Sequence, residues 1–440
     1  MLQLTEKGET ITTMSALSSK PYKGTKDYYP EDKAIQNYIF DMWRRTVELY
    51  GYQEYGTPLL EPLEIYTAKS GQELASEQTY SFTDRGGRLV AIRPEMTPSV
   101  SRIVAEKRQE LAYPARLFSI GNFMRYERPQ RGRDREFWQL NVDLFGADGV
   151  AAEAETIKLV DHLMSALGAS RDMYAIRVNN RKLVNFLMAK YFGLDTVAAQ
   201  AMMKLFDRRD KIPEDAFFEQ ADEIFGDEFQ DGRDKLRQIL SAKSFADLPS
   251  AITESRAVDD IQQLFSYLKR LGIDNIVFDI TLMRGLDYYT DMVFEVYDTD
   301  PANNRSMFGG GRYDGLVGLF GVEPLSAVGF AIGLSPIELF IQSHNLVPDT
   351  SITSELYIVV AGDGMMKAMQ LADVLRARGT KVEVDVTMRK LDKQIKSADK
   401  KRARFVVFVG DQEVESGVYN VKDLTTGQAR SVTENELLSL

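Results

Sequence analysis

Apolar and polar positions follow two different periods along this chain of 440 residues, and the two periods predict its elements. Between Pro30 and Gly51 apolar side chains recur about once per helical turn, which predicts an amphipathic helix. They are Ile35, Ile39, Trp43 and Val47. The same period over 152–168 predicts a second helix, and the run 173–180 is typical of a strand.

The stretch 123–145 changes to a period of two, which predicts two strands joined by a turn. On the first strand this period places on one face Phe123, Arg125 and Glu127. On the second strand apolar and polar side chains alternate, and the apolar set is expected to face the core: Trp138, Leu140, Val142 and Leu144. The opposite, polar face then holds Gln139, Asn141 and Asp143.

The turn of this hairpin is rich in arginine, whose planar guanidinium binds phosphate through two donors at once. Its arginines are Arg125, Arg128, Arg131, Arg133 and Arg135. The carboxylate of Glu127 can accept a hydrogen bond from an adenine amino group, and Phe137 can stack on a base. These residues favour a phosphate or nucleotide site, and the alternative is an exposed hairpin with surface salt bridges.

The order of the periodic segments divides the chain into parts. Residues 1–19 are polar and lack a period, which predicts a disordered tail. Strand signals occur over 20–180 and again over 273–343, and the charged stretch 181–272 between them is predicted to be a helical insertion. After a polar segment that contains a proline, 353–440 alternates strand and helix, which predicts a separate α/β domain.

Composition excludes several kinds of chemistry. The chain has no cysteine, which rules out disulfides, thiol nucleophiles and zinc held by cysteine, and no metal site is predicted. Its two histidines, His162 in a helical pattern and His344 in a polar connector, are expected to be structural or on the surface. No apolar run approaches the roughly 18 residues of a membrane span, and the N-terminus lacks a signal-peptide pattern, so we expect a soluble cytoplasmic protein.

The net charge of −11 argues against a nucleic-acid partner for the chain as a whole, because lysine and arginine neutralise phosphate. Basic residues nevertheless cluster between Met388 and Phe405. The cluster comprises Arg389, Lys390, Lys393, Lys396, Lys400, Lys401, Arg402 and Arg404. A local contact with nucleic acid is therefore expected in the C-terminal domain.

Three long stretches resemble one family. FMRYERPQRGRDREFWQLNVDLFG (123–146) resembles motif 2 of the class II aminoacyl-tRNA synthetases, in the form found in histidyl-tRNA synthetases. LMRGLDYYTDMVFEVY (282–297) and FGGGRYDGLV (308–317) are similar to the two histidine-specific signatures. The resemblance runs from about Tyr22 to the C-terminus. It implies an α+β catalytic domain with an antiparallel sheet and flanking helices, a helical insertion, and a C-terminal α/β anticodon-binding domain.

The resemblance also implies an activity: a ligase that activates histidine with ATP and Mg²⁺ and transfers it to tRNA(His). The enzyme would be a homodimer without a membrane partner, and YQEYGTP (52–58), which is similar to motif 1, would contribute to the dimer interface. The residues matched to catalysis are Arg125, Arg284 and Gln139. Those matched to ATP are Arg125, Glu127, Arg133, Phe137 and Arg284. Those matched to histidine are Glu95, Thr97, Gln139, Asp143, Tyr289 and Tyr313. Those matched to tRNA are Arg128, Gln130, Arg389, Lys390 and Lys393.

Two positions depart from the family pattern. Asp143 stands where most bacterial relatives carry glutamate, so the carboxylate is kept on a shorter side chain. Pro336 stands where motif 3, similar to AVGFAIGLSPIEL (327–339), has an arginine that holds ATP. We expect Pro336 in the first turn of a helix capped by Ser335, whose free amide donors would offset part of the lost charge. The alternative function is that of a catalytically inactive relative that senses histidine, like the regulatory subunit of ATP phosphoribosyltransferase.

Overall fold

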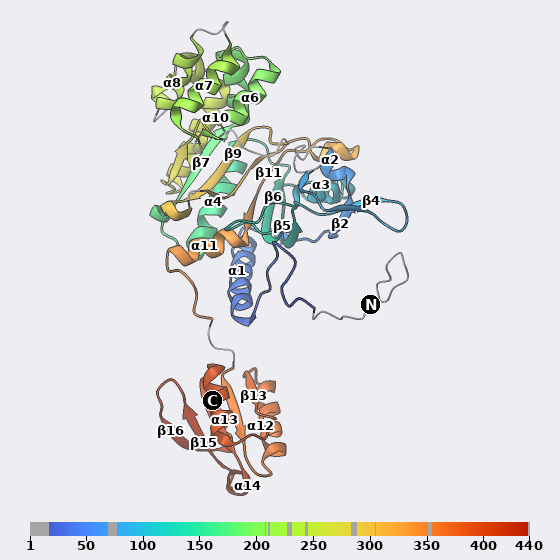
Figure 1. The fold of residues 1–440 in the computed structure, drawn as a ribbon, viewed down its shortest axis with the longest axis vertical. Helices are drawn as coiled ribbons and strands as arrows, with labels where there is room; N and C mark the ends of the chain where they lie inside the picture. The colour runs from blue at the N-terminus through green and yellow to red at the C-terminus, as the bar shows by residue number, and fades with distance from the viewer. Residues whose placement is uncertain are drawn as a thin grey trace. The chain divides into compact units, whose positions relative to one another are not determined.

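The computed structural model of the chain divides into two compact units, and each is described by itself (Figure 1). The larger comprises 1–29 and 36–347, and the smaller comprises 30–35 and 348–440. The structure describes residues 17–68, 77–206, 208–209, 212–226, 231–242, 245–282, 288–303, 305–350 and 354–438. Most of the tail predicted to be disordered, 1–19, therefore lies outside the described residues. No helix in those ranges combines the length and apolar content that crossing a bilayer requires.

An eight-stranded sheet forms the centre of the larger unit, in the order β1-β5-β6-β11-β10-β9-β7-β8. Its strands are β1 (Gln53–Glu54), β5 (Ala115–Met124), β6 (Glu136–Phe145), β7 (Tyr174–Asn180), β8 (Ile276–Phe278), β9 (Met292–Asp298), β10 (Ser306–Arg312) and β11 (Ala327–Gly333). Neighbouring strands are antiparallel except at its two edges, where β1 with β5 and β7 with β8 are parallel. The predicted antiparallel sheet is confirmed.

Amphipathic helices cover the apolar face of this sheet. They are α1 (Pro30–Glu48), α4 (Val150–Ala166) and α11 (Leu334–Ser343). Trp43 of α1 is fully buried, and the ring of Phe40 lies 5.3 Å from that of Trp138 on β6. The helices predicted from Pro30 and over 152–168 are thus confirmed. On the other side lie α2 (Glu64–Thr67), α3 (Thr97–Glu106) and a small sheet of β2 (Leu60–Pro62), β4 (Leu89–Ile92) and β3 (Ser81–Thr83).

The predicted hairpin is β5 and β6, with Phe123 paired opposite Phe137. One detail of the prediction is wrong: β5 ends at Met124, so Arg125 and Glu127 lie in the turn. The strand ends there because the backbone turns to other segments, as Tyr126 N bonds to Gln78 O at 2.7 Å. The polar face of β6 is also not exposed to solvent, since Asn141 and Asp143 are each only 4% exposed.

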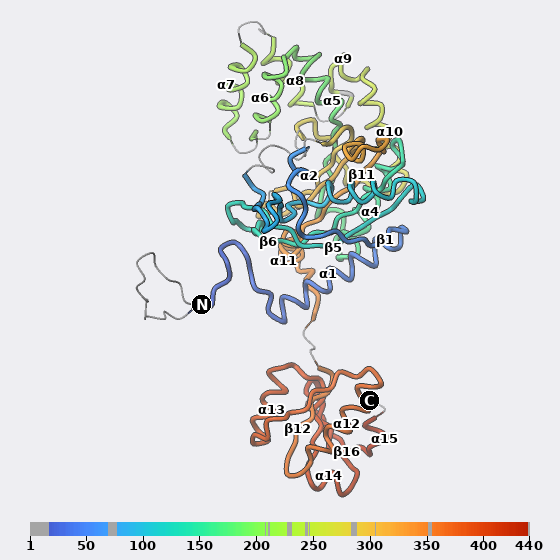
Figure 2. Tube along the Cα trace, turned by 90° about the vertical axis from the view of Figure 1, so that its right-hand side faces the viewer, coloured from blue at the N-terminus to red at the C-terminus, as the bar shows by residue number. Residues whose placement is uncertain are grey.

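The described chain between β7 and β8 is helical. It forms α5 (Arg181–Phe186), a π-helical turn η3 (Leu187–Tyr191), α6 (Thr196–Phe206), α7 (Glu214–Phe225), α8 (Gly232–Ser241), α9 (Ser250–Thr253) and α10 (Arg256–Arg270). These helices share a core that includes Leu183, Met202, Phe217, Leu236 and Ile261. They gather at one end of the larger unit, as Figure 2 shows, and α10 packs against α4.

The smaller unit is a five-stranded sheet in the order β13-β12-β14-β15-β16. Its elements are β12 (Leu356–Val360), α12 (Met365–Ala377), β13 (Val382–Val384), α13 (Leu391–Lys400), β14 (Phe405–Val409), α14 (Asp411–Ser416), β15 (Val418–Asp423), β16 (Ala429–Thr433) and α15 (Glu434–Leu437). The first three strands are parallel, as the alternation of strand and helix predicted. A final antiparallel pair, β15 and β16, extends the sheet.

Candidate active site

A cavity of about 120 Å³ lies against the polar face of β6. Its walls come from four places: the polar side chains of β6, the start of α3, the tyrosines that precede β9, and the facing parts of β10 and β11. The lining residues are Glu95, Thr97, Arg125, Gln139, Asn141, Asp143, Tyr288, Tyr289, Gly309, Tyr313, Gly329, Phe330 and Ala331. All six residues expected to bind histidine are among them, together with Arg125.

One end of the cavity presents an acidic group. Glu95, in the loop that leads into α3, is only 4% exposed, and its Oε2 accepts a hydrogen bond of 2.8 Å from the Tyr288 hydroxyl. Thr97 is the first residue of α3, and Gln139 on β6 also lines the cavity. Burial, followed by the charge of Glu95, raises the pKa of Tyr288 well above its ordinary value, so the phenol stays a donor.

The cavity also holds a second carboxylate, Asp143. Its Oδ1 accepts a hydrogen bond of 2.5 Å from the Tyr313 hydroxyl. Burial raises the pKa of Asp143 from 3.8 to about 7, and the bond from Tyr313 opposes part of this rise. Burial also raises the pKa of Tyr289, next to the charges of Glu95 and Asp143. A ligand N–H group that donates a hydrogen bond to the Asp143 carboxylate would therefore stabilise its charged form.

Close contact between strands makes Gly329 necessary in this wall. Gly329 pairs opposite Asp143, and a Cβ built on it would lie 2.4 Å from Asp143 Oδ1 and 2.6 Å from Val142 O. Similarly, a Cβ on Gly310 would lie 2.2 Å from Gly329 O. The glycines of the second signature are thus residues of β10 that let the strands approach, and only Gly309 of the three lines the cavity.

Asn141 and Tyr288 line the cavity although neither was predicted to bind histidine. The alternation along β6 places Asn141 between Gln139 and Asp143, so the sequence carried a signal for it. Its Nδ2 is buried without a hydrogen-bond partner in the part of the chain that the structure describes. Tyr288 precedes the predicted Tyr289. The β11 residues Gly329, Phe330 and Ala331 gave no signal, because only the pairing of β6 with β11 brings them there.

The arginine-rich turn contributes Arg125 to the cavity. Its Nε donates to Pro94 O at 2.9 Å, and its guanidinium carbon lies 5.2 Å from the centre of the Phe137 ring. Phe137 in turn stacks on Phe123 at 5.8 Å. The Arg125 guanidinium is therefore held in place while its remaining donors stay available for a ligand.

The five arginines of this turn do not act as one set. Arg135 is only 9% exposed and donates to Glu127 O at 3.1 Å and to the Tyr22 hydroxyl at 3.0 Å, so it holds the turn to an earlier segment of the chain. Arg133 is exposed and lies 3.2 Å from Glu127 Oε2. The turn therefore also contains a surface salt bridge of the kind that the alternative interpretation expected.

Comparison with known proteins identifies the family. A model of the histidyl-tRNA synthetase family matches residues 24–337, and a model of an anticodon binding domain matches residues 355–440. The chain is 36% identical to a histidine–tRNA ligase of Leptospira biflexa over 426 residues, which cover 96% of this chain and 97% of that protein. This chain belongs to the histidyl-tRNA synthetase family.

Other relatives agree with this assignment. A histidine–tRNA ligase of Haloarcula marismortui is 36% identical and covers 93% of this chain and 94% of its own length. The crystal structure of apo histidyl-tRNA synthetase from S. aureus matches with a TM-score of 0.72 at 27% identity, over 96% of this chain and 98% of that one. The class II fold of the histidyl-tRNA synthetase family, with its catalytic and anticodon-binding parts, is therefore established for this chain.

The motif 3 region of this family member departs from the prediction in one respect. The helix α11 begins at Leu334, with Gly333 rather than Ser335 as its N-cap. The reason is that β11 runs directly into the helix, so Ser335 already lies in the first turn and donates to Asp134 Oδ2 at 3.2 Å. Pro336 occupies the first turn as predicted. Helix amides at this position have no partner within the helix, so the missing N–H costs little.

The other residues matched to family functions lie apart from the cavity or outside the described chain. Arg284 lies outside the described residues. Arg128 and Gln130 are exposed on the turn, where Gln130 Oε1 accepts from Arg305 at 2.9 Å. In the smaller unit, Arg389 pairs with Asp385 at 3.1 Å, and Lys390 and Lys393 are exposed at the start of α13.

Both histidines have contacts within the protein. His162 on α4 lies 5.8 Å from the ring of Tyr50, and His344 accompanies the end of α11 as its C-cap. His344 Nε2 lies 2.8 Å from Asp298 Oδ1. The helix ends at Ser343, so His344 lies at the start of the connector, and neither histidine lines the cavity.

Proposed function

We propose that this chain is a histidine–tRNA ligase, which joins histidine to ATP as histidyl adenylate and then transfers histidine to tRNA(His). The observation that carries the proposal is the cavity beside β6. Six residues from four separate segments of the chain line it, and each has the chemistry that histidine requires. The histidine-tRNA ligase relatives, at 34–36% identity over most of the chain, support the same activity.

Each end of the cavity suits one end of histidine. Glu95, Thr97 and Gln139 provide acceptors for the α-ammonium group. At the opposite end Asp143 and Tyr289 would bond the two imidazole nitrogens, and Tyr313 would hold the Asp143 carboxylate in position. Because Glu95, Asp143 and Tyr313 are buried, an amino acid that leaves their polar groups unpaired is strongly disfavoured.

ATP would lie on the side of the cavity where Arg125 enters. Adenylate formation needs the histidine carboxylate to attack the α-phosphate, where negative charge accumulates, and fixed cations stabilise that charge without moving a proton. Arg125 and Arg284 are proposed for this role, with Gln139 orienting the carboxylate. Glu127 and Phe137 would hold adenine, and Arg133 would leave its pair with Glu127 to reach the outer phosphates. ATP is proposed to enter as its Mg²⁺ complex, since Mg²⁺ commonly binds substrate phosphates with few protein ligands.

The remaining parts are proposed to bind tRNA and to form a dimer. The catalytic domain would comprise 20–180 and 273–343, with 181–272 as an insertion. Arg128 and Gln130 would meet the end of the tRNA that receives histidine. In 353–440, the basic residues Arg389, Lys390 and Lys393 would meet the anticodon, and the reaction would take place in the cytoplasm.

A homodimer is supported by apolar side chains that are exposed around the small sheet of the larger unit. They are Leu59, Leu60, Phe82 and Leu89, each more than 40% exposed. Exposed apolar groups gathered in this way are typical of protein interfaces. Light scattering on the purified chain tests this part, and a mass of 49.8 kDa, that of one chain, would contradict it.

Histidine-dependent exchange of pyrophosphate into ATP tests the activity. Histidine alone among the twenty amino acids should support exchange. Comparable exchange with another amino acid, and none with histidine, would refute the assignment. Binding of histidine without exchange at any ATP concentration would favour the alternative, a histidine-sensing regulatory protein. The reason to consider that alternative is that Pro336 replaces the motif 3 arginine.

A further inference from the structure

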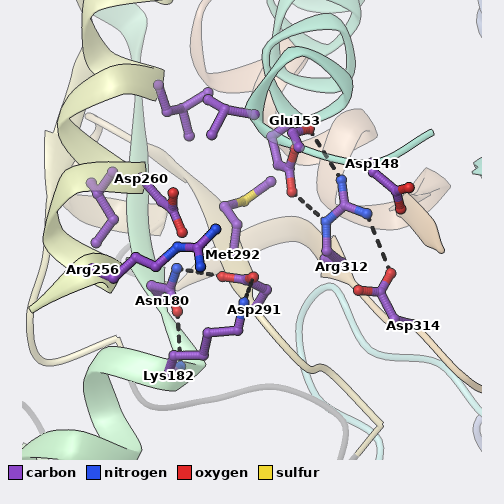
Figure 3. A pocket seen from close by; sticks show the side chains of 14 residues that line it. Asp148, Glu153, Asn180, Lys182, Arg256, Asp260, Asp291, Met292, Arg312 and Asp314 are labelled. Atoms are coloured by element: carbon purple, nitrogen blue, oxygen red, sulfur yellow. Dashed lines mark hydrogen bonds and ion pairs between the residues drawn. The ribbon is translucent and has the colours of Figure 1, made fainter.

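A buried ion pair anchors the end of the strand that leads to Tyr313. Arg312 is the last residue of β10, and its Nε donates to Glu153 Oε1 on α4 at 2.5 Å. Both residues are buried, at 4% and 5% exposure. Figure 3 shows the pair, with Asp314 beside it, in the wall of a separate cavity of about 230 Å³. The end of β10 is therefore fixed to α4 by a charge-assisted hydrogen bond.

Three further acceptors hold the Arg312 guanidinium. Nη1 donates to Ala147 O and to Asp314 Oδ1, each at 3.2 Å, and Nη2 donates to Gly149 O at 3.3 Å. Arg312 and Asp314 are the two chain neighbours of Tyr313. The residues on both sides of Tyr313 are thus fixed to one cation.

These contacts set the position of Tyr313. Its N–H group donates to Ala327 O at 2.8 Å, and Ala327 N donates back to Asp314 Oδ1 at 3.0 Å. The Tyr313 side chain lines the cavity beside β6, where its hydroxyl donates to Asp143. Neighbouring residues therefore face different cavities, since Arg312 lines the one in Figure 3.

Thr290 connects the same strand end to Tyr289. Thr290 N donates to Arg312 O at 2.8 Å. Its hydroxyl accepts from Asp314 N at 3.1 Å and donates to Arg312 O at 3.4 Å. These bonds reach both chain neighbours of Tyr313, and Tyr289 directly precedes Thr290. The hydroxyl of Thr290 therefore fixes the backbone of one tyrosine relative to the other.

The tyrosine rings are packed closely on the side of the cavity beside β6. A Cβ built on Gly311 would lie 3.0 Å from Tyr289 Cδ1, so this ring lies directly over β10. The Tyr288 ring lies 5.2 Å from that of Tyr289 and 5.8 Å from that of Tyr313. Because the three rings pack as one group, a backbone shift next to one of them moves the others.

We propose that Thr290 and Asp314 are positioning residues that determine the affinity for histidine. They hold Tyr289 and Tyr313 at the separation that the imidazole ring requires. Binding groups must be held within about 0.5 Å of their productive positions by the residues around them. Neither Thr290 nor Asp314 lines the cavity beside β6, so each acts through the tyrosines. The inference rests on the proposed function, which assigns these tyrosines to the imidazole end of histidine.

Thr290→Val tests the proposal in pyrophosphate exchange. Valine keeps the shape of threonine without the hydroxyl, so the bond from Asp314 N is lost while the backbone bond to Arg312 O remains. The KM for histidine should rise about fivefold, the scale of one hydrogen bond, whereas the KM for ATP should change by less than about twofold. An unchanged KM for histidine would overturn the proposal. Equal rises for histidine and ATP would also overturn it, because they would indicate a general loss of structure.

Two further threonine variants are the controls. Thr290→Ser keeps the hydroxyl and should restore the wild-type KM for histidine. Thr299→Val is the matched control, because Thr299 is an exposed threonine after the other end of β9 whose hydroxyl donates to Asp172 O at 2.9 Å. It should leave both constants unchanged. A rise in Thr299→Val or in Thr290→Ser equal to that in Thr290→Val would contradict the role of the Thr290 hydroxyl.

Asp314→Ala tests the other positioning residue. It removes the acceptor of Ala327 N and of Arg312 Nη1, so it should raise the KM for histidine more than Thr290→Val does. A smaller effect than that of Thr290→Val would exclude Asp314 from the role. If this variant does not fold, the Thr290 variants still decide the matter.

Calorimetric titration with histidine separates this inference from the ligase activity. If the wild-type chain binds histidine without exchange, the proposed reaction fails, but the positioning role is still tested by the dissociation constants of Thr290→Val and Thr290→Ser. They should differ about fivefold. Normal exchange with an unchanged KM for histidine in Thr290→Val refutes only the positioning role. Absence of histidine binding in the wild type would overturn both.

Discussion

The Tyr313 hydroxyl donates to Asp143 Oδ1 at 2.5 Å, and this is the one hydrogen bond to the Asp143 side chain in the described part of the chain. Asp143 is thus a buried carboxylate with a single donor. Its second oxygen accepts no hydrogen bond from the described residues, and we propose that it bonds the substrate. Predictions about stability and specificity follow from this arrangement.

Asp143→Asn should change how stability depends on pH. The pKa of Asp143 is about 7 in the folded chain, above its value near 4 in the unfolded chain, so the folded state holds the extra proton between these values. Stability therefore falls as pH rises from about 4 to about 7, by about 4 kcal/mol in total, and the loss is complete above that range. The variant should lack this fall.

Urea unfolding at several pH values measures this difference. The two tryptophans, Trp43 and Trp138, both lie in the larger unit, so their fluorescence reports on the unit that contains Asp143. As pH rises, the free energy of unfolding of the variant should increasingly exceed that of the wild type. Identical pH dependence of the two proteins would show that burial does not raise this pKa.

Gly329→Ala should disturb the same end of the cavity. The added Cβ would meet Asp143 Oδ1 and Val142 O at distances that real structures do not show, and both neighbours are held by strand pairing. We expect a loss of about 1–3 kcal/mol in the free energy of unfolding, typical of overpacking, and weaker histidine binding. Gly56→Ala is the control, since nothing lies within 4 Å of a Cβ there. Equal effects of the two substitutions would contradict the close-approach argument.

Arg125→Ala should slow pyrophosphate exchange on the order of a hundredfold, the scale of losing one electrostatic donor to a transition state. Histidine affinity should change much less, because the other residues assigned to histidine remain. Arg131→Ala, an exposed arginine of the same turn with no assigned role, should leave exchange unchanged. Steady-state exchange rates at saturating substrates provide the measurement. Similar losses in both variants would mean that general charge, rather than the placement of Arg125, matters.

The sequence predicted this site well wherever a short stretch carries the chemistry. The period of two along β6 placed Gln139, Asn141 and Asp143 on one face, and the structure has that face over the cavity. What the period could not predict was burial, because the cover over this face comes from α3 and Tyr313, which are distant in sequence. The sequence pattern of a polar strand face is therefore the same whether the face is exposed to water or covered by another part of the chain.

The predictions that failed share one physical cause. Arg135 resembles its neighbours in sequence, but its contact with Tyr22 depends on a segment far away in the chain. Likewise Ser335 is a good N-cap by residue type, but β11 continues to Gly333 and the helix starts before Ser335. In both cases tertiary contacts overrode a local preference. The described chain gives no test of Arg284.

Pro336→Arg should lower the apparent KM for ATP. The position lies in the first turn of α11, where a substitution breaks no helical hydrogen bond, and the arginine would restore a cation that the family uses against ATP. Pro336→Ala removes the proline without adding charge and serves as the control. Initial rates of exchange over a range of ATP concentrations give both values. If alanine lowers KM as much as arginine does, backbone freedom rather than charge is responsible.

A chain that ends at Val347 should keep exchange activity but bind tRNA poorly. The two units have separate hydrophobic cores, and the basic cluster lies wholly in the smaller one. Loss of its phosphate contacts should also flatten the dependence of tRNA affinity on salt concentration. Filter binding at several salt concentrations compares the two forms. Unchanged affinity and slope would place the main tRNA contact in the larger unit.

The contact between Arg135 and Tyr22 joins residues that are 113 positions apart. During synthesis at roughly 5–20 residues per second, Tyr22 leaves the ribosome's catalytic centre about 6–23 s before Arg135 is made. Throughout that interval the segment ahead of α1 lacks its hydrogen bond from Arg135. The arginine-rich turn therefore acquires its shape late, when β6 begins to form. At that point Arg135 can bond to Tyr22, near the N-terminal end of the described chain.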